Sequence, residues 1–327
     1  MRPIPPNFHL ARGLLGPFKE MLTAPVHEED VRIDLPVRGV ALHARIHHGM
    51  SNGASLSPRT GVIISHPYGP LGGDLRNNVV RELATAFARR GIPTLRYSMR
   101  GAGKSSGRTS WTAAAESDDL AALVDWWTQG GDTNAGPTWT ADNGTCYTRA
   151  VPERVLLVGY SYGSLVSLPV ARTHDRACGL IMVSPPAGVT WALTAMQTST
   201  YSAPLPLAMP KLVVMGDKDQ FSSEGTMVAF TAKVCGTEPG SGGSGGGMVL
   251  GSPHDNGREE LVEGTVRAAS ADVVIVKDRD HFWVGEEDAI VDLVEAWVER
   301  TYGWTARPAA AAAATAVGAG TDLSAAF

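Results

Sequence analysis

The chain has 327 residues, of which 43% are hydrophobic and 19% are charged, and its formal net charge is −5. This length allows one large hydrophobic core or two small ones, and the composition is typical of a soluble globular protein. The acidic balance argues against a surface that binds nucleic acid. No apolar run approaches the roughly 20 residues of a membrane-spanning helix, so no transmembrane segment is expected.

The N-terminal extension, residues 1–30, carries no strong structural signal. Residues 1–22 lack the continuous apolar segment of a secretory signal. Basic side chains outnumber acidic ones there, so an organelle transit peptide is the alternative to the cytoplasmic location that we favour. The three cysteines are widely spaced and predict neither a disulfide framework nor a metal site, which fits a reducing compartment: Cys146, Cys178 and Cys235.

Hydrophobic patterning then predicts alternating strands and helices. Two strands, 31–35 and 40–47, flank a turn at Arg38 and Gly39. Further strands are expected at 61–65, 92–97, 155–159, 180–184, 212–215 and 272–276. Helices are expected at 74–90, with Asp74 as N-cap, and at 116–127, 165–172 and 286–300. Short apolar strands separated by amphipathic helices predict an α/β fold with a doubly wound, mostly parallel sheet and helices on both faces.

This pattern predicts a single domain over residues 31–304. Two stretches within it, 129–149 and 236–257, are rich in glycine and small polar residues and are expected to be flexible insertions. The tail, residues 305–327, is mostly alanine and is expected to be disordered.

A G-x-S-x-G motif at residues 159–163 ends one predicted strand and begins a helix. In such a motif the serine occupies a strained turn, and its hydroxyl projects above the sheet. The N–H of Tyr162 then lies at a helix start, where it can bind a developing oxyanion. Because parallel sheets carry their sites at the carboxyl ends of the strands, Ser161 is the candidate nucleophile.

A serine hydroxyl needs a general base, and the base needs a group that orients it. On this fold the expected chain order is serine, acid, histidine. His281 follows the strand at 272–276 in a loop just before a helix, whereas His254 lies in the glycine-rich insertion. The sequence therefore predicts His281 as the general base.

Two carboxylates compete for the role of the acid after the strand at 212–215. We choose Asp219 because it lies further into the turn and beyond the sheet edge, whereas Asp217 is close enough to the strand to bond the turn backbone. Asp278 and Asp280 are too near His281 along the chain to orient it.

The second oxyanion donor is expected in the loop after the strand at 61–65. Pro67 has no N–H, so Tyr68 is the candidate, and the following glycines permit a tight loop. His66 precedes the nucleophile in the chain, and we expect it to hold this loop by a hydrogen bond rather than to act as the base.

These motifs together resemble the α/β-hydrolase superfamily over residues 31–300, in particular its small hydrolases with little or no lid. The resemblance rests on five segments: the His66-Pro67 loop, Arg100-Gly101-Ala102-Gly103-Lys104-Ser105, the 159–163 motif, the Gly216-x-x-Asp219 turn and Asp280-His281-Phe282-Trp283. It implies hydrolysis of an acyl ester without a cofactor or metal. The two insertions and the alanine-rich tail depart from the family pattern.

The short segment between Pro185 and Met209 occupies the usual position of a lid. Trp191 in this segment and Trp283 beside the histidine are candidates for an apolar acyl pocket, with packing in the core as the equal alternative. The expected partner is a small-molecule ester. Thioesterase, peptidase and acyltransferase activity stay open because they use the same triad, and the oligomeric state stays open as well.

Two rival interpretations are weaker. The segment Gly101 to Ser105 is similar to the end of a phosphate-binding P-loop, but that motif requires a glycine where Ser98 stands. A hydrolase fold used only for binding would be expected to lack a member of the triad, and none is missing.

Overall fold

A computed structural model describes residues 26–49, 60–131, 136–142, 144, 146–236, 249–251 and 271–304, the segment 249–251 by its backbone alone. The predicted disordered tail, most of the second insertion with His254, and most of the N-terminal extension lie outside these residues.

The described strands form a nine-stranded sheet in the order β1-β2-β4-β3-β7-β8-β9-β11-β10. Their bounds are β1 (Glu29–Leu35), β2 (Val40–His47), β3 (Thr60–Ser65), β4 (Thr94–Tyr97), β7 (Arg154–Tyr160), β8 (Ala177–Val183), β9 (Lys211–Gly216), β10 (Val249–Gly251) and β11 (Ala271–Val276). Strand β2 is antiparallel to both β1 and β4. The remaining neighbours pair in parallel, so the predicted doubly wound, mostly parallel sheet is confirmed.

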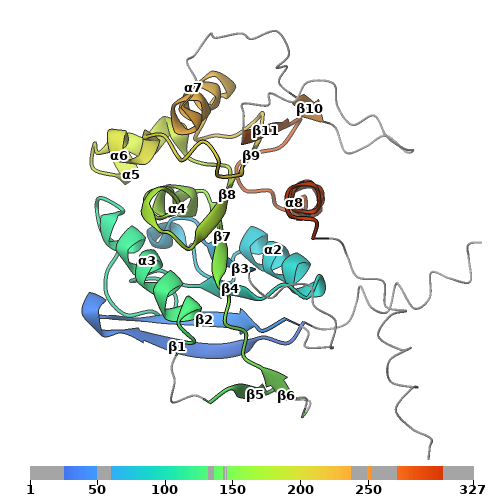
Figure 1. The fold of residues 1–327 in the computed structure, drawn as a ribbon. Coiled ribbons are helices and arrows are strands. Elements are labelled where there is room, and N and C mark those ends of the chain that lie inside the picture. Colours follow the sequence, from blue (N-terminus) through green and yellow to red (C-terminus); the bar gives the residue numbers. More distant parts are fainter. Residues whose placement is uncertain are drawn as a thin grey trace, which may run out of the picture.

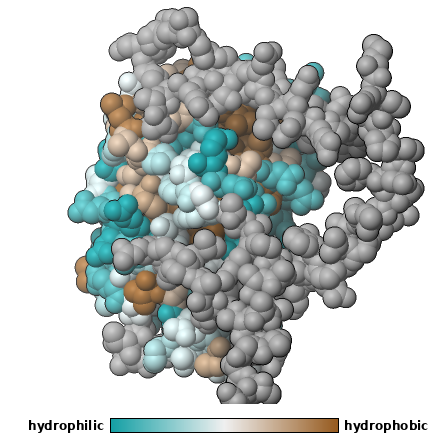
Figure 2. All heavy atoms as spheres, turned by 45° about the vertical axis from the view of Figure 1, so that its right-hand side comes forward, coloured by the Kyte–Doolittle hydropathy of each residue, from teal (hydrophilic) through white to brown (hydrophobic). Residues whose placement is uncertain are grey.

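Helices cover both faces of this sheet (Figure 1). One face carries α2 (Asn78–Arg89) and α8 (Glu287–Tyr302), and the other carries α3 (Ala114–Thr128) and α4 (Tyr162–Thr173). Each face has its own buried apolar cluster, because the central strands present hydrophobic side chains in both directions. On the face shown in Figure 2, hydrophobic residues lie in small groups among hydrophilic ones.

The chain between β8 and β11 contributes three further helices: α5 (Thr190–Leu193), α6 (Thr198–Ser202) and α7 (Glu224–Cys235). The sequence analysis did not predict them. Helix α7 lacks a strong apolar period, but its N-cap is Ser223, whose side chain accepts a hydrogen bond from the Thr226 N–H. Its buried side chains extend the apolar cluster of the α3–α4 face.

The structure differs from the sequence predictions in three local details. Helix α2 begins at Asn78 with Asn77 as its N-cap, because the Asp74 carboxylate instead accepts hydrogen bonds from the backbone and guanidinium of Arg76. Within the stretch 129–149, β5 (Thr138–Thr140) and β6 (Cys146–Thr148) pair as a small antiparallel sheet, which the sequence analysis did not predict. Strand β1 begins two residues earlier than expected, at Glu29.

No helix in the described ranges is both long enough and apolar enough to cross a membrane. The three cysteines are all free thiols.

Candidate active site

Ser161 lies on a strained turn between β7 and α4. Its φ of 53° and ψ of −121° are values that residues other than glycine rarely adopt. The backbone holds this turn: the Ser161 N–H donates to the Val183 carbonyl at 2.8 Å. A Cβ at Gly159 would lie 2.4 Å from the Gly163 oxygen, and one at Gly163 would lie 2.3 Å from the Ser65 oxygen. Both glycines are therefore required for the close approach of the chain on either side of the serine.

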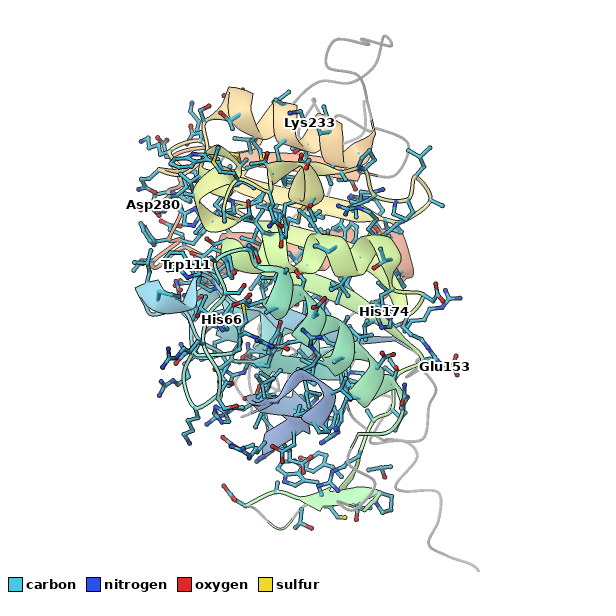
Figure 3. All side chains as sticks on the ribbon, turned by 90° about the vertical axis from the view of Figure 1, so that its left-hand side faces the viewer. His66, Trp111, Glu153, His174, Lys233 and Asp280 are labelled. Atoms are coloured by element: carbon cyan, nitrogen blue, oxygen red, sulfur yellow. The ribbon has the colours of Figure 1, made fainter. Side chains whose placement is uncertain are left out.

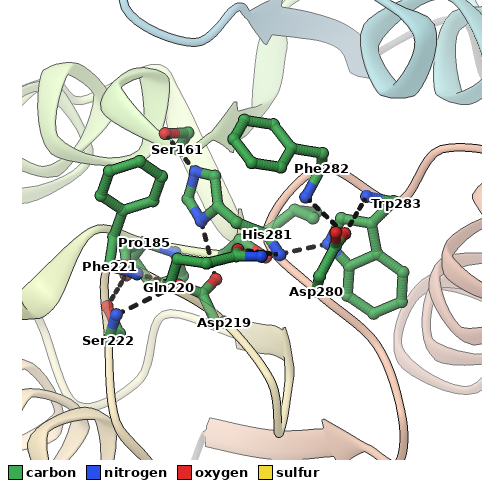
Figure 4. Close-up of polar contacts among 12 residues, drawn as sticks. Ser161, Pro185, Asp219, Gln220, Phe221, Ser222, Asp280, His281, Phe282 and Trp283 are labelled. Carbon is green, nitrogen blue, oxygen red and sulfur yellow. Dashed lines mark hydrogen bonds and ion pairs between the residues drawn. The ribbon is translucent and has the colours of Figure 1, made fainter.

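His281 lies beside Ser161, although 120 residues separate them in the sequence. Its Nε2 is 2.8 Å from the Ser161 Oγ, and its Nδ1 is 2.7 Å from Oδ2 of Asp219 (Figure 4). The imidazole is held by its backbone as well: Tyr160 Oη donates to the His281 carbonyl, and the His281 N–H donates to Oε1 of Gln220. The histidine is thus fixed in position between the hydroxyl and the carboxylate.

The carboxylate of Asp219 is completely buried. Its Oδ1 accepts hydrogen bonds from the backbone N–H groups of Phe221, at 2.8 Å, and Ser222, at 3.0 Å. These two donors stabilise the negative charge and leave Oδ2 to accept from Nδ1–H of His281. Nε2 is then the proton acceptor that faces Ser161.

The structure places Asp219, not Asp217, next to His281. One carboxylate oxygen of Asp217, Oδ1, is buried and has no hydrogen-bond partner in the described part of the chain. The Asp217 N–H instead donates to the Val276 carbonyl, which ties the turn to the neighbouring strand.

Tyr68 and Tyr162 meet above the ends of β3 and β7. Their rings pack edge to face with centroids 5.0 Å apart. Tyr162 is the first residue of α4, so its N–H belongs to the helix turn that has no acceptor within the helix. Tyr68 precedes the short 3₁₀ turn Gly69–Leu71. The two residues predicted to donate to an oxyanion therefore lie side by side, one before a 3₁₀ turn and one at the start of α4.

His66 is buried directly behind the Tyr68 loop. Its Nδ1 donates to the Pro67 carbonyl at 2.5 Å, and its Nε2 accepts from the Met99 N–H at 2.8 Å. Burial lowers the pKa of His66 to about 4, although the bond to Pro67 opposes this shift. These contacts confirm the prediction that His66 holds the loop by a hydrogen bond.

The two tryptophans proposed for a pocket lie in different surroundings. Trp283 is buried in the apolar cluster of the α2–α8 face, and its Nε1 donates to Oγ of Ser184 at 2.9 Å. The core alternative is therefore correct for Trp283. Trp191 lies on α5 and is exposed.

Sequence reasoning missed two aromatic side chains beside His281. The ring centroid of Phe221 is 4.5 Å from that of His281, and the centroid of Phe282 is 5.6 Å from it, both edge to face. The two rings flank the Ser161–His281 contact (Figure 4). The available signal was their position next to a catalytic candidate in the sequence, Phe221 two residues after Asp219 and Phe282 directly after His281.

The loop similar to a P-loop is used for internal contacts. Arg100 forms two hydrogen bonds, at 2.6 and 2.5 Å, with the carboxylate of Asp119. The Ser105 hydroxyl donates to the Ser98 carbonyl and accepts from the His43 N–H. These polar groups join the loop to α3 and β2, which argues against a phosphate site.

The fold and the arrangement of the site define a serine hydrolase of the α/β-hydrolase class. The model of the family described as X-Pro dipeptidyl-peptidase (S15 family) matches residues 39–231. The chain belongs to this family. A search of curated proteins finds no match.

Solved structures share the fold. A lidless α/β serine hydrolase from Xanthomonas campestris is 21% identical, with a TM-score of 0.57, covering 85% of this chain and 96% of its own. Est1E from Butyrivibrio proteoclasticus, solved with ferulic acid bound, is 16% identical, with a TM-score of 0.56 and coverages of 84% and 99%. The esterase Pf2001 of Pyrococcus furiosus is 16% identical, with a TM-score of 0.55 and coverages of 86% and 94%. At these identities the likeness shows the α/β-hydrolase fold.

Proposed function

We propose that this protein hydrolyses acyl esters through an acyl-enzyme formed on Ser161. The supporting observation is the continuous contact from Ser161 Oγ to His281 Nε2, at 2.8 Å, and from His281 Nδ1 to Asp219, at 2.7 Å. A serine hydroxyl becomes nucleophilic when such a base can accept its proton.

In the first half of the reaction, Ser161 Oγ attacks the acyl carbon while His281 takes its proton. Asp219 holds the imidazole in the Nδ1–H tautomer and stabilises the imidazolium that forms. The N–H groups of Tyr68 and Tyr162 bind the oxyanion. The imidazolium then protonates the departing alkoxide, and the alcohol leaves.

In the second half, water replaces the alcohol. His281 takes a proton from this water as its oxygen attacks the acyl carbon, and the same donors bind the second oxyanion. Collapse of the intermediate releases the carboxylic acid and returns the proton to Ser161 Oγ.

The ester preference draws on two relatives, one named an esterase and one solved with ferulic acid. The matched family model favours a second candidate, the release of an X-Pro dipeptide. That reaction needs a group that binds the free ammonium of the peptide, normally a carboxylate at the site. Asp219 already bonds His281, and Oδ1 of Asp280 accepts from the N–H groups of Phe282 and Trp283.

A substrate panel separates these functions. The purified chain is assayed with nitrophenyl butyrate, a butyryl thioester and glycyl-proline nitroanilide, with Ser161→Ala as the background for each. The proposal expects the largest Ser161-dependent kcat/KM for the oxygen ester. A larger value for the nitroanilide would identify a peptidase, and acyl transfer to an added alcohol in preference to water would identify an acyltransferase.

A further inference from the structure

Exposed hydrophobic side chains gather on the edge of the molecule that carries the site. Six of the ten large hydrophobic residues exposed in the described part of the chain lie in the segments that follow the carboxyl ends of the parallel strands. We call this set the apolar rim: Leu71, Trp111, Trp191, Met196, Phe282 and Val284. In Figure 3, Trp111, His66 and Asp280 lie on one side of the molecule, and Glu153 and His174 lie on the other.

The loops that carry the rim contact one another in sequence around Ser161. A Cβ at Gly69, beside Leu71, would lie 3.7 Å from Oγ1 of Thr109, so the Leu71 and Trp111 loops pack together. Tyr201 of α6 donates a hydrogen bond from its hydroxyl to the Thr112 carbonyl. This bond joins the Trp111 loop to the segment that contains Trp191 and Met196.

Further contacts join the segment before α5 to the Phe282 loop, and the Phe282 loop to the start of α2. The Gly188 N–H, just before α5, donates to the Phe221 carbonyl at 3.0 Å. The rings of Phe221 and Phe282 lie 6.2 Å apart, and Asn78 Nδ2 donates to the Phe282 carbonyl at 3.2 Å. Asn78 begins α2, directly after the Leu71 loop. The rim thus surrounds the site rather than lying to one side of it.

Trp111 is presented outward by a fixed loop. Its side chain is 83% exposed, yet both of its neighbours are anchored. The Ser110 N–H donates to Oε1 of the buried Glu116 at 2.6 Å, and the Thr112 carbonyl accepts from Tyr201. A large indole held in solvent is typical of a surface that meets an apolar partner.

We propose that the apolar rim docks this protein onto the surface of aggregated neutral esters, such as a micelle or an emulsion droplet. This rests on the proposed esterase function, because the rim encircles the nucleophile. A protein or a second copy bound to all sides of the rim would close off Ser161, whereas an ester surface supplies it with substrate. The charge favours a neutral surface over an anionic one, because the chain carries a formal net charge of −5.

The test measures binding apart from turnover. Ser161→Ala, which leaves the ester intact, is mixed with a triacylglycerol emulsion stabilised by phosphatidylcholine, and the fraction that floats with the droplets gives a partition coefficient. Adding Leu71→Ser or Trp111→Ser is expected to lower that coefficient about tenfold, because each removes one large apolar side chain from the contact.

The matched control is Leu207→Ser in the same background. Leu207 is 65% exposed and precedes β9, so it lies at the opposite edge of the sheet. It is expected to change the partition coefficient less than twofold. Equal effects of Leu71→Ser and Leu207→Ser, or no flotation of the parent, would overturn the rim proposal. So would a dimer in solution that Leu71→Ser dissociates, since the rim would then be an interface between copies.

Hydrolysis of dissolved nitrophenyl butyrate by the wild-type chain is measured in parallel. Turnover without flotation would reject the rim and leave the esterase proposal intact. Flotation without turnover of any ester would reject the esterase proposal instead.

Discussion

Two buried histidines in this molecule each bond a carboxylate through one ring nitrogen and differ in what faces the other nitrogen. His281 Nδ1 is 2.7 Å from Asp219, and His48 Nε2 is 2.7 Å from Glu29. The second nitrogen of His281 faces the Ser161 hydroxyl at 2.8 Å, whereas that of His48 accepts from the Ala150 N–H at 3.2 Å. A hydroxyl can give up its proton to imidazole, and a backbone amide cannot.

The two carboxylates also differ in their partners. Glu29 forms an ion pair with Arg149, which follows β6 and also donates to the carbonyl of Thr138 at the start of β5. The His48 pair thereby joins the small β5–β6 sheet to the edge of the main sheet. Asp219 accepts from two backbone N–H groups, and the only side chain that it bonds in the described part of the chain is His281. A histidine–carboxylate pair therefore has a catalytic arrangement only when a nucleophile completes it.

Removing the nucleophile is expected to have the largest effect. Ser161→Ala should lower kcat for a nitrophenyl ester by about 10⁴-fold or more, because the His281 pair then has no hydroxyl to deprotonate. The melting temperature should stay the same or rise, since the strained turn keeps its glycines. Retention of normal ester turnover would mean that another residue is the nucleophile.

Changing the acid is expected to have the next largest effect. Asp219→Asn should lower kcat about 10³-fold to 10⁴-fold, because an amide favours the wrong tautomer of His281. Asp217→Asn, two residues earlier, is the matched control and should alter kcat by less than about threefold, since its carboxylate does not bond His281. Equal losses from both substitutions would contradict the assignment of the acid.

Replacing the carboxylate of the His48–Glu29 pair by an amide should affect stability rather than activity. Glu29→Gln removes the charge shared by His48 and Arg149 and should lower the free energy of unfolding by about 2 kcal/mol. The kcat of ester hydrolysis should stay within about twofold, because the pair is remote from Ser161. Urea unfolding and initial-rate assays on the same preparation measure both quantities, and a loss of kcat in fully folded protein would make this region part of the site.

The smallest expected effect is on the way the folding stability depends on pH. Burial raises the pKa of Glu29, but hydrogen bonds from His48 and Arg149 and the charge of Arg149 outweigh it and lower the pKa from 4.5 to about 2. The folded state therefore binds the Glu29 proton less readily than the unfolded state does. This contribution is complete above pH 4.5 and is lost as the pH falls towards 2. Wild type should lose more stability than Glu29→Gln between pH 5 and pH 3 in thermal melts, and parallel curves would contradict the shift.

The sequence pointed to the contacts among Ser161, Asp219 and His281 because each of these residues carries a local signal. Ser161 has glycines two residues away on either side, and Asp219 and His281 each follow a short apolar strand whose end is readable from hydrophobicity. These strands are parallel neighbours or near neighbours in the sheet, so the loops at their carboxyl ends bring the three side chains together. Hydrophobic periodicity and the rule that sites lie at the carboxyl ends of parallel strands predict this arrangement.

The His48 cluster had no such signal. Glu29 and Arg149 are 120 residues apart, and Arg149 lies in a stretch whose composition predicts a loop. The sequence analysis did not predict the apolar rim either, because the exposure of these side chains depends on tertiary packing. The misplaced N-cap at Asp74 reflects a competing local contact with Arg76, which a capping rule does not weigh.

The most direct test of the central claim is covalent labelling of the intact chain with a fluorophosphonate, followed by peptide mass spectrometry. The account predicts one label per chain, on Ser161, with labelling abolished in Ser161→Ala and strongly slowed in His281→Gln. A label on any other residue, or undiminished labelling of Ser161→Ala, would contradict it.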